Sequence, residues 1–290
     1  MAPYHLHAPA RRDTCCVFAS PHSARDYPAW FLNASDLDAL TLRSSEDAFV
    51  DQLFSAAPSF GAPLLLAGAP RAFVDLNRNA DELDPALIHD VRHSGHNPRV
   101  SAGLGVIPRV VAGGRAIYKG KMSRAEALQR IQTIWRPYHA ALARQMDGAQ
   151  AMFGRAILID CHSMPHEAMD GSLRPGARRP DVVLGDRFGA SAAADITERI
   201  EEAFTDAGLV VARNTPFAGA YVTQTYGRPA QGRHAIQIEI DRSLYMDERS
   251  VRPAPGFTEF QMLLEGVIDR IAGIGRADPG AAGTLPLAAE

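Results

Sequence analysis

The sequence predicts an α/β fold of three layers, in which a mixed, mainly parallel sheet lies between helices. Short apolar runs alternate along the chain with segments whose apolar residues recur at helical spacing, which is typical of this class. The run AILIDCHSMP (156–165) indicates a central strand buried on both faces. A chain of 290 residues that is 46% hydrophobic can also form one large core. We therefore expect a single domain over residues 1–290, with loose tails at about 1–12 and 276–290.

Six apolar runs predict strands of this sheet. They begin at residues 15, 64, 72, 156, 209 and 235. His22 follows the first run, and His162 lies with Asp160 at the carboxyl end of the central one, where open α/β sheets bind ligands. A single histidine at this position is more often just a polar residue that follows a strand. Two such histidines with acids nearby instead favour a ligand-binding site.

The last predicted strand, AIQIEI (235–240), places Gln237 and Glu239 on one face because side chains alternate along a strand. An inward carboxylate is costly unless it has a partner, so Glu239 needs a physical reason to be there.

Four segments predict helices: residues 44–57, 123–142, 191–207 and 258–274. In the first, Glu46 and Asp47 fall in the opening turn, where the helix dipole alone could account for both acids. The second begins with the capping-box pattern SRAE and contains Pro137, which should kink or divide it. Between the first two helices, residues 103–118 contain glycines and a proline at intervals that are typical of a hairpin or of a flap over a site.

Composition excludes several classes of protein. The formal charge of −3 provides no basic surface for nucleic acid or for anionic membranes. Three cysteines cannot form a disulfide framework, and neither a membrane-spanning run nor a signal peptide is evident, so we expect a cytoplasmic protein. Three histidines are spaced like possible metal ligands: His89, His93 and His96. They lie in a polar segment that leads into a loop, so exposure to solvent is the simpler interpretation.

Several motifs, in order along the chain, resemble those of the N-formylglutamate amidohydrolase family, which is similar in fold to the zinc carboxypeptidases. The resemblance runs from about residue 16 to 271. It is carried by PHSARDYP, DLNRNADELD, LIDCHSMP, PDVVLGDRFG, PFAGAYVTQTYGRP and HAIQIEIDRSLYMDE. The family's frequent PHSG glycine is replaced here by Ala24, a small change that leaves the metal ligands intact.

The resemblance implies one divalent metal ion, zinc, held by His22, His162 and a carboxylate. Two imidazoles and a carboxylate leave zinc an open position for water. The zinc carboxypeptidases take their acid from three residues after the first histidine, but Arg25 stands at that position here. Asp47 and Asp26 are the alternatives, and Asp47 is preferred from the family's deformylase branch.

The same resemblance implies the roles of the other site residues. Asn77 and Arg78 match the pair that holds a substrate carboxylate, and Glu239 matches the catalytic glutamate of the last strand. Arg187 is the expected partner of the second substrate carboxylate, with Arg228 and Arg242 as alternatives.

The expected activity is metal-dependent hydrolysis of N-formyl-L-glutamate, or of a related N-acyl amino acid, to the free amino acid and formate or another carboxylate. The expected partner is therefore a small-molecule N-acyl amino acid, with no nucleic acid and no membrane. Two alternatives stay open at this point: a zinc-dependent peptidase or amidase for another N-acyl substrate, and a non-catalytic binding protein, which would not need Glu239.

Overall fold

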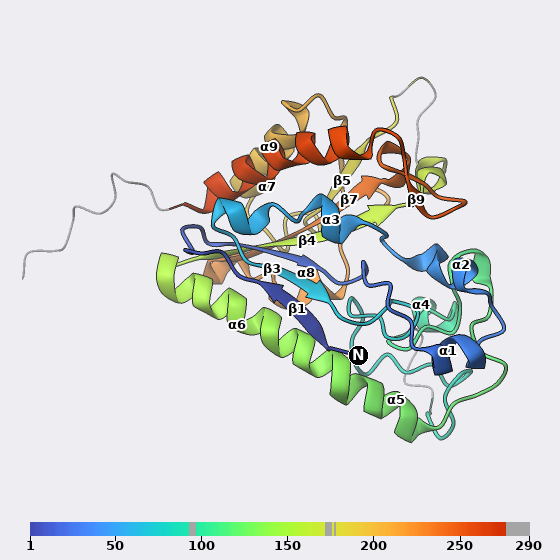
Figure 1. Ribbon diagram of the computed structural model, residues 1–290. Coiled ribbons are helices and arrows are strands. Elements are labelled where there is room, and N and C mark those ends of the chain that lie inside the picture. Colours follow the sequence, from blue (N-terminus) through green and yellow to red (C-terminus); the bar gives the residue numbers. More distant parts are fainter. Residues whose placement is uncertain (93–96, 172–175, 177, 277–290) are drawn as a thin grey trace, which may run out of the picture.

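The computed structural model describes residues 1–92, 97–171, 176 and 178–276. Its seven-stranded sheet has the order β1-β3-β2-β4-β7-β5-β6 (Figure 1). The strands are β1 (Tyr4–His7), β2 (Cys16–Ser20), β3 (Leu64–Ala67), β4 (Ala156–Met164), β5 (Val182–Gly185), β6 (Val211–Arg213) and β7 (Arg233–Asp241), with a separate pair β8 (Met246–Asp247) and β9 (Arg252–Pro253).

Four neighbouring strands, β3, β2, β4 and β7, are parallel, whereas β1 and β5 pair antiparallel with their neighbours β3 and β7. The sheet is therefore mixed and mainly parallel, as predicted. Strand β4 is at its centre, and all nine of its residues are buried. This burial accounts for the near-continuous apolar run, because a strand covered on both faces cannot alternate apolar with polar residues.

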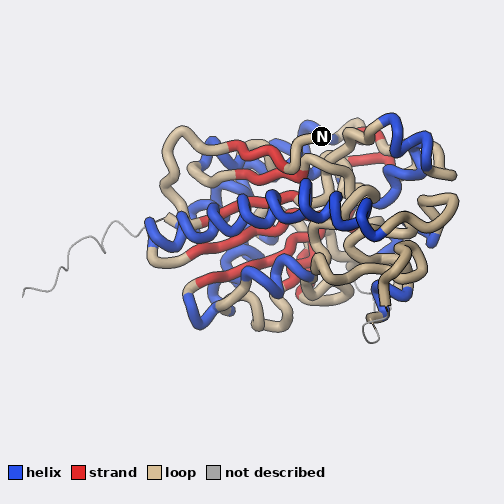
Figure 2. Tube along the Cα trace, turned by 90° about the horizontal axis from the view of Figure 1, so that it is seen from below, coloured by secondary structure: helices blue, strands red, loops and turns tan. Residues whose placement is uncertain are grey.

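Helices cover both faces of the sheet, which confirms the three layers. Helix α6 crosses the strands on one face, while α7 and α9 pack together on the other (Figures 1 and 2). The helices are α1 (Ala29–Ala34), α2 (Ala39–Leu42), α3 (Val50–Leu53), α4 (Pro98–Ser101), α5 (Arg124–Arg130), α6 (Arg136–Phe153), α7 (Ala194–Thr205), α8 (Tyr221–Tyr226) and α9 (Phe257–Gly275).

The second predicted helix is divided as expected. Ser123 accepts a hydrogen bond from the Glu126 amide at the start of α5, and a π-helical stretch, Ile131–Trp135, separates α5 from α6. Pro137 lies in the first turn of α6, directly after this π-helical stretch, as expected for a proline that interrupts a helix. None of the helices in the described ranges is long and apolar enough to cross a membrane.

Four expectations for local structure are wrong. Residues 4–7 are not a loose tail, because they form β1 on the edge of β3. Residues 72–74 form a turn rather than a strand. Residues 103–118 contain the antiparallel bridge between Val110 and Ala116 but no hairpin strands, so the hairpin is wrong. The alternative of a flap over a site agrees with the structure, because Leu104, Pro108 and 110–114 line the cavity described below. The helix expected over 44–57 is confined to α3 because Phe49, just before it, has a left-handed backbone with φ of 67°.

The expected C-terminal tail lies mostly in residues 277–290, outside the described residues, and so do His93 and His96. His89 is exposed. The division of the chain into domains stays a prediction.

Candidate active site

A cavity of about 590 Å³ opens at the carboxyl ends of the parallel strands. Its volume is in the range typical of small-molecule sites. Strands β4 and β7 contribute His162, Gln237 and Glu239 to its wall. The loop after β2 contributes His22. Six of the seven site residues predicted from the sequence line this cavity: His22, Asp47, Asn77, Arg78, His162 and Glu239.

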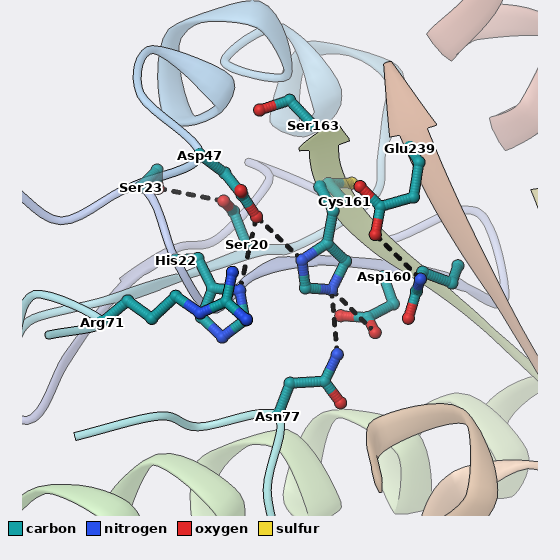
Figure 3. A network of polar contacts seen from close by, with 12 residues as sticks. Ser20, His22, Ser23, Asp47, Arg71, Asn77, Asp160, Cys161, Ser163 and Glu239 are labelled. Atoms are coloured by element: carbon teal, nitrogen blue, oxygen red, sulfur yellow. Dashed lines mark hydrogen bonds and ion pairs between the residues drawn. The ribbon is translucent and has the colours of Figure 1, made fainter. Parts of the chain in front are cut away.

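His22, Asp47 and His162 form a buried group whose potential ligand atoms all lie within 4.8 Å of one another. Oδ2 of Asp47 is 2.9 Å from Nδ1 of His162 and 3.3 Å from Nδ1 of His22. Figure 3 shows Asp47 pointing toward the imidazole rings. Burial alone would raise the pKa of Asp47, but the contacts with His162 and His22 hold it well below its usual range. Two imidazole nitrogens and an ionised carboxylate oxygen are a donor set that suits zinc.

Asp47 reaches this position from outside a helix. It precedes α3, and its amide donates a 3.0 Å hydrogen bond to the His22 carbonyl, which ties the two residues together. The expectation that Asp47 opens a helix is therefore wrong, although its carboxylate does face the histidines. The alternative acid, Asp26, is exposed and is not in this group.

Glu239 lies beside His162 because the two residues are register partners on β7 and β4. Gln237, two residues earlier on the same face, donates a 2.9 Å hydrogen bond from Nε2 to Oε1 of Glu239. Burial raises the pKa of Glu239 to about 7, with the charge of His162 opposing and that of Asp47 adding to the shift. A carboxylate with a pKa near neutrality can both accept and release a proton.

Asn77 and Arg78 lie on a loop that is fixed by several hydrogen bonds. Oδ1 of Asn77 accepts from the Val222 amide at 2.8 Å, and Arg78 donates to the carbonyls of Leu104 and of Asn77. Arg78 is 7% exposed and has no carboxylate within ion-pair distance among the described residues. Its charge is therefore available to an anion in the cavity.

Arg187 does not line the cavity. Its backbone is left-handed, and its side chain packs against Gly219. The wall instead carries Arg71, Arg99 and Arg242. Arg242 is one of the alternatives that the sequence offers, but Arg71 and Arg99 are not, because an isolated arginine in a turn or in a four-residue helix gives no periodic signal in a sequence.

Fold and site together define a class: an α/β protein whose cavity, lined by several charged side chains, opens at the carboxyl ends of its parallel strands, where this architecture holds its ligands. The model of the N-formylglutamate amidohydrolase family matches residues 14–246. The chain therefore belongs to the N-formylglutamate amidohydrolase family, and it is a hydrolase that acts on a non-peptide amide.

Three similar proteins support this assignment. An N-formylglutamate deformylase of Pseudomonas aeruginosa is 33% identical over 243 residues, which cover 81% of this chain and 83% of the relative. One from Pseudomonas putida is 34% identical over 209 residues, covering 70% and 71%. The crystal structure of an N-formylglutamate amidohydrolase from Ralstonia eutropha JMP134 has a TM-score of 0.88 and 35% identity, covering 95% of this chain and 99% of that one.

A fourth protein shares the fold alone. The crystal structure of a gene product from Agrobacterium tumefaciens has a TM-score of 0.62 at 16% identity, and the match covers 94% of this chain and 96% of that one.

Proposed function

We propose that this protein is a metal-dependent deformylase that hydrolyses N-formyl-L-glutamate to L-glutamate and formate. The observation that carries the proposal is the buried group His22–Asp47–His162 in the same cavity as Glu239 and Arg78. The activity named for the two Pseudomonas relatives supports the same reaction. Three free cysteines, all buried, fit a cytoplasmic location, where thiols stay reduced.

His22, His162 and Asp47 would hold the metal ion, through Nδ1 of each histidine and Oδ2 of Asp47. The ion, when bound, would polarise the formyl carbonyl and make the attacking water more acidic. Zinc is our choice, because two imidazoles and one carboxylate are a common catalytic set for it.

Glu239 would act as the general base. It would accept a proton from the water as the water oxygen attacks the formyl carbon, and it would deliver that proton to the nitrogen as the C–N bond breaks. The hydrogen bond from Gln237 holds one carboxylate oxygen of Glu239, so the other oxygen is free for this transfer.

Arg78, supported by Asn77, would hold the α-carboxylate of the substrate. We propose Arg99 for the side-chain carboxylate, in place of Arg187. Burial lowers the pKa of Arg78, Asp75 opposes this shift, and the charges of Arg71 and Arg99 add to it. Several positive charges on the wall of one cavity favour an anionic ligand there.

Arg99 is exposed, but the segment that carries it is attached to the loop of Arg78. Nδ2 of Asn97 donates to Oε2 of Glu82 at 3.2 Å, and the Val106 amide donates to the Glu82 carbonyl at 2.9 Å. Hydrogen bonds therefore connect the segments that carry the two arginines.

The test is an assay of formate release by protein of measured metal content. We expect turnover of N-formyl-L-glutamate to exceed that of N-formyl-L-glutamine and of N-acetyl-L-glutamate. Equal turnover of peptides or of uncharged N-acyl amino acids would contradict the proposed substrate.

A further inference from the structure

The nitrogen of each histidine that faces away from Asp47 lies against a second, buried carboxylate. Nε2 of His22 is 2.8 Å from Oδ1 of Asp75, and Nε2 of His162 is 3.0 Å from Oδ2 of Asp160. Asp75 is 2% exposed and Asp160 is fully buried. Figure 3 shows Asp160 and Asn77 on the side of the imidazole opposite to Asp47. Neither outer acid belongs to the group that could hold the metal.

Asp160 is the more unusual of the two acids. The sequence predicts it at the end of a strand, but β4 continues to Met164, so Asp160 lies inside the core. Within the described part of the chain, neither of its carboxylate oxygens accepts a well-aligned hydrogen bond, and its ion-pair contact is with His162. Because burial of a carboxylate is costly, a core strand gains no stability from this residue. The contact with His162 points to a role that Asp160 exerts through that ring.

The position of the proton on His162 identifies that role. If Nδ1 is to offer its lone pair to a cation beside Asp47, the proton of the neutral ring must be on Nε2. Nδ2 of Asn77 also lies near Nε2, at 3.2 Å, but it is a donor and cannot accept this proton. The orientation of Asn77 is fixed, since its Oδ1 accepts from the Val222 amide. Of these two groups at Nε2, Asp160 is thus the one that can accept, and its Oδ2 lies 3.0 Å away in an ion-pair contact that is not aligned as a hydrogen bond.

We propose that Asp75 and Asp160 are positioning residues that keep the protons of His22 and His162 on Nε2, direct both Nδ1 atoms toward Asp47 and thereby strengthen metal binding. The inference rests on the proposed metal-dependent function. A carboxylate that accepts from the outer nitrogen of an imidazole fixes its tautomer and makes its inner nitrogen a better donor to a metal.

The two outer acids differ in how they are themselves held. Asp75 also accepts from Nε of Arg71 at 3.1 Å and from the Asn77 amide at 2.8 Å, so its loss would disturb the substrate loop as well. Asp160 does not line the cavity, so it reaches the site through His162. A substitution of Asp160 therefore tests the effect of an outer acid with less disturbance of the substrate loop than a substitution of Asp75.

The experiment compares Asp160→Asn with the wild-type protein and with Asp26→Asn, the same change at an exposed acid. An asparagine has nearly the same shape, but its amide can donate to Nε2 as readily as its oxygen can accept, so the preference for one tautomer is lost. Zinc and cobalt affinities are measured by competition with a chelator. We expect Asp160→Asn to weaken both about ten- to a hundredfold, and Asp26→Asn to leave both within about twofold of wild type.

A second readout does not depend on metal binding or on the variant folding. Nitrogen-15 NMR of the metal-free wild-type protein, at a pH where the ring is neutral, distinguishes the two tautomers of His162. A proton on Nε2 is the expected result, and a proton on Nδ1 would overturn the inference.

The outcomes separate this inference from the proposed function. If the wild-type protein binds neither metal, the metal-dependent function fails. If the wild-type protein binds metal and Asp160→Asn binds it equally well, with only a change in melting temperature, Asp160 is a structural residue and the inference alone fails.

Discussion

The two ends of the cavity are built from different parts of the chain. At one end, His162 and Glu239 lie on neighbouring strands of the sheet, and each has a side-chain partner that fixes it. At the other end, Arg78 lies on a loop and Arg99 on the four-residue helix α4, and neither has an acidic partner among the described residues. The first end is suited to chemistry, which needs fixed atoms, and the second to selecting an anionic substrate.

This difference predicts which substrates should be affected by mutations in each part of the cavity. Changes at the strand-borne end should lower turnover of every substrate, because they remove groups that act on the reacting bond. Changes at the end that carries Arg78 and Arg99 should affect substrates according to their charge.

The largest effect is expected at Glu239. Glu239→Gln keeps the shape and the contact with Gln237 but cannot accept a proton, so kcat should fall about a hundred- to ten-thousandfold. Metal content and melting temperature should stay near those of the wild type. Near-normal turnover in the metal-loaded variant would remove Glu239 from the mechanism.

The second-largest effect is expected for Arg78→Ala. Its lower kcat/KM for N-formylglutamate should correspond to a loss of transition-state stabilisation on the order of 2 to 5 kcal/mol, as for other charge pairs in buried surroundings. Its metal content should not change. Arg124→Ala, at an exposed helix position, is the matched control. If the Arg78 and Arg124 variants had the same kinetics, the proposed recognition of the α-carboxylate would be wrong.

His139 links helix α6 to the loop of Asn77, because its Nε2 donates to the Leu76 carbonyl at 2.9 Å. Burial lowers the pKa of His139 from 6.5 to about 4, so between these values the unfolded chain binds a proton that the folded chain does not. This contribution to stability is complete above pH 6.5 and is lost as the pH falls toward 4, by about 3 kcal/mol at most.

Urea unfolding of the wild type and of His139→Gln at several pH values from 7 to 4 measures this contribution. The stability of the wild type should fall more steeply with decreasing pH than that of the variant. Parallel curves would show that His139 does not contribute to the pH dependence.

The smallest effect is expected at Arg99, because an exposed charge is screened by water. Arg99→Ala should lower kcat/KM for N-formyl-L-glutamate about fivefold. The same variant should act on N-formyl-L-glutamine as the wild type does, since that substrate lacks the side-chain charge. An equal loss on both substrates would assign Arg99 to the stability of the loop rather than to recognition.

The central strand can be predicted from the sequence, because a continuous apolar run such as that of β4 suits a strand that is covered on both faces. Strand β5 is not predicted, although all four of its residues are buried. Its three apolar residues, 182–184, directly follow the charged, glycine- and proline-rich segment 166–181, which is typical of a loop. The helix expected around α3 fails for a local reason, since Phe49 has a left-handed backbone, which is uncommon for residues other than glycine and which the apolar spacing does not signal.

The two ends of the site can be predicted from the sequence to different degrees. His22 and His162 can be found because they follow or end apolar runs, and Glu239 because an inward acid is conspicuous in a strand. The family resemblance, rather than any pattern, leads to Asp47 and Arg78. Arg99 reaches the cavity only because distant segments meet, which spacing along one chain does not encode. The contact between Asp160 and His162, two residues apart on β4, instead follows from the alternation of side chains along a strand.

Titration of metal into the metal-free enzyme tests the central claim most directly. The protein is stripped with a chelator, and formate release from N-formyl-L-glutamate is followed as zinc is added back. We predict that the stripped protein is inactive, and that activity rises linearly with zinc and reaches its plateau at one ion per chain. Full turnover by protein shown to contain no metal would contradict the account.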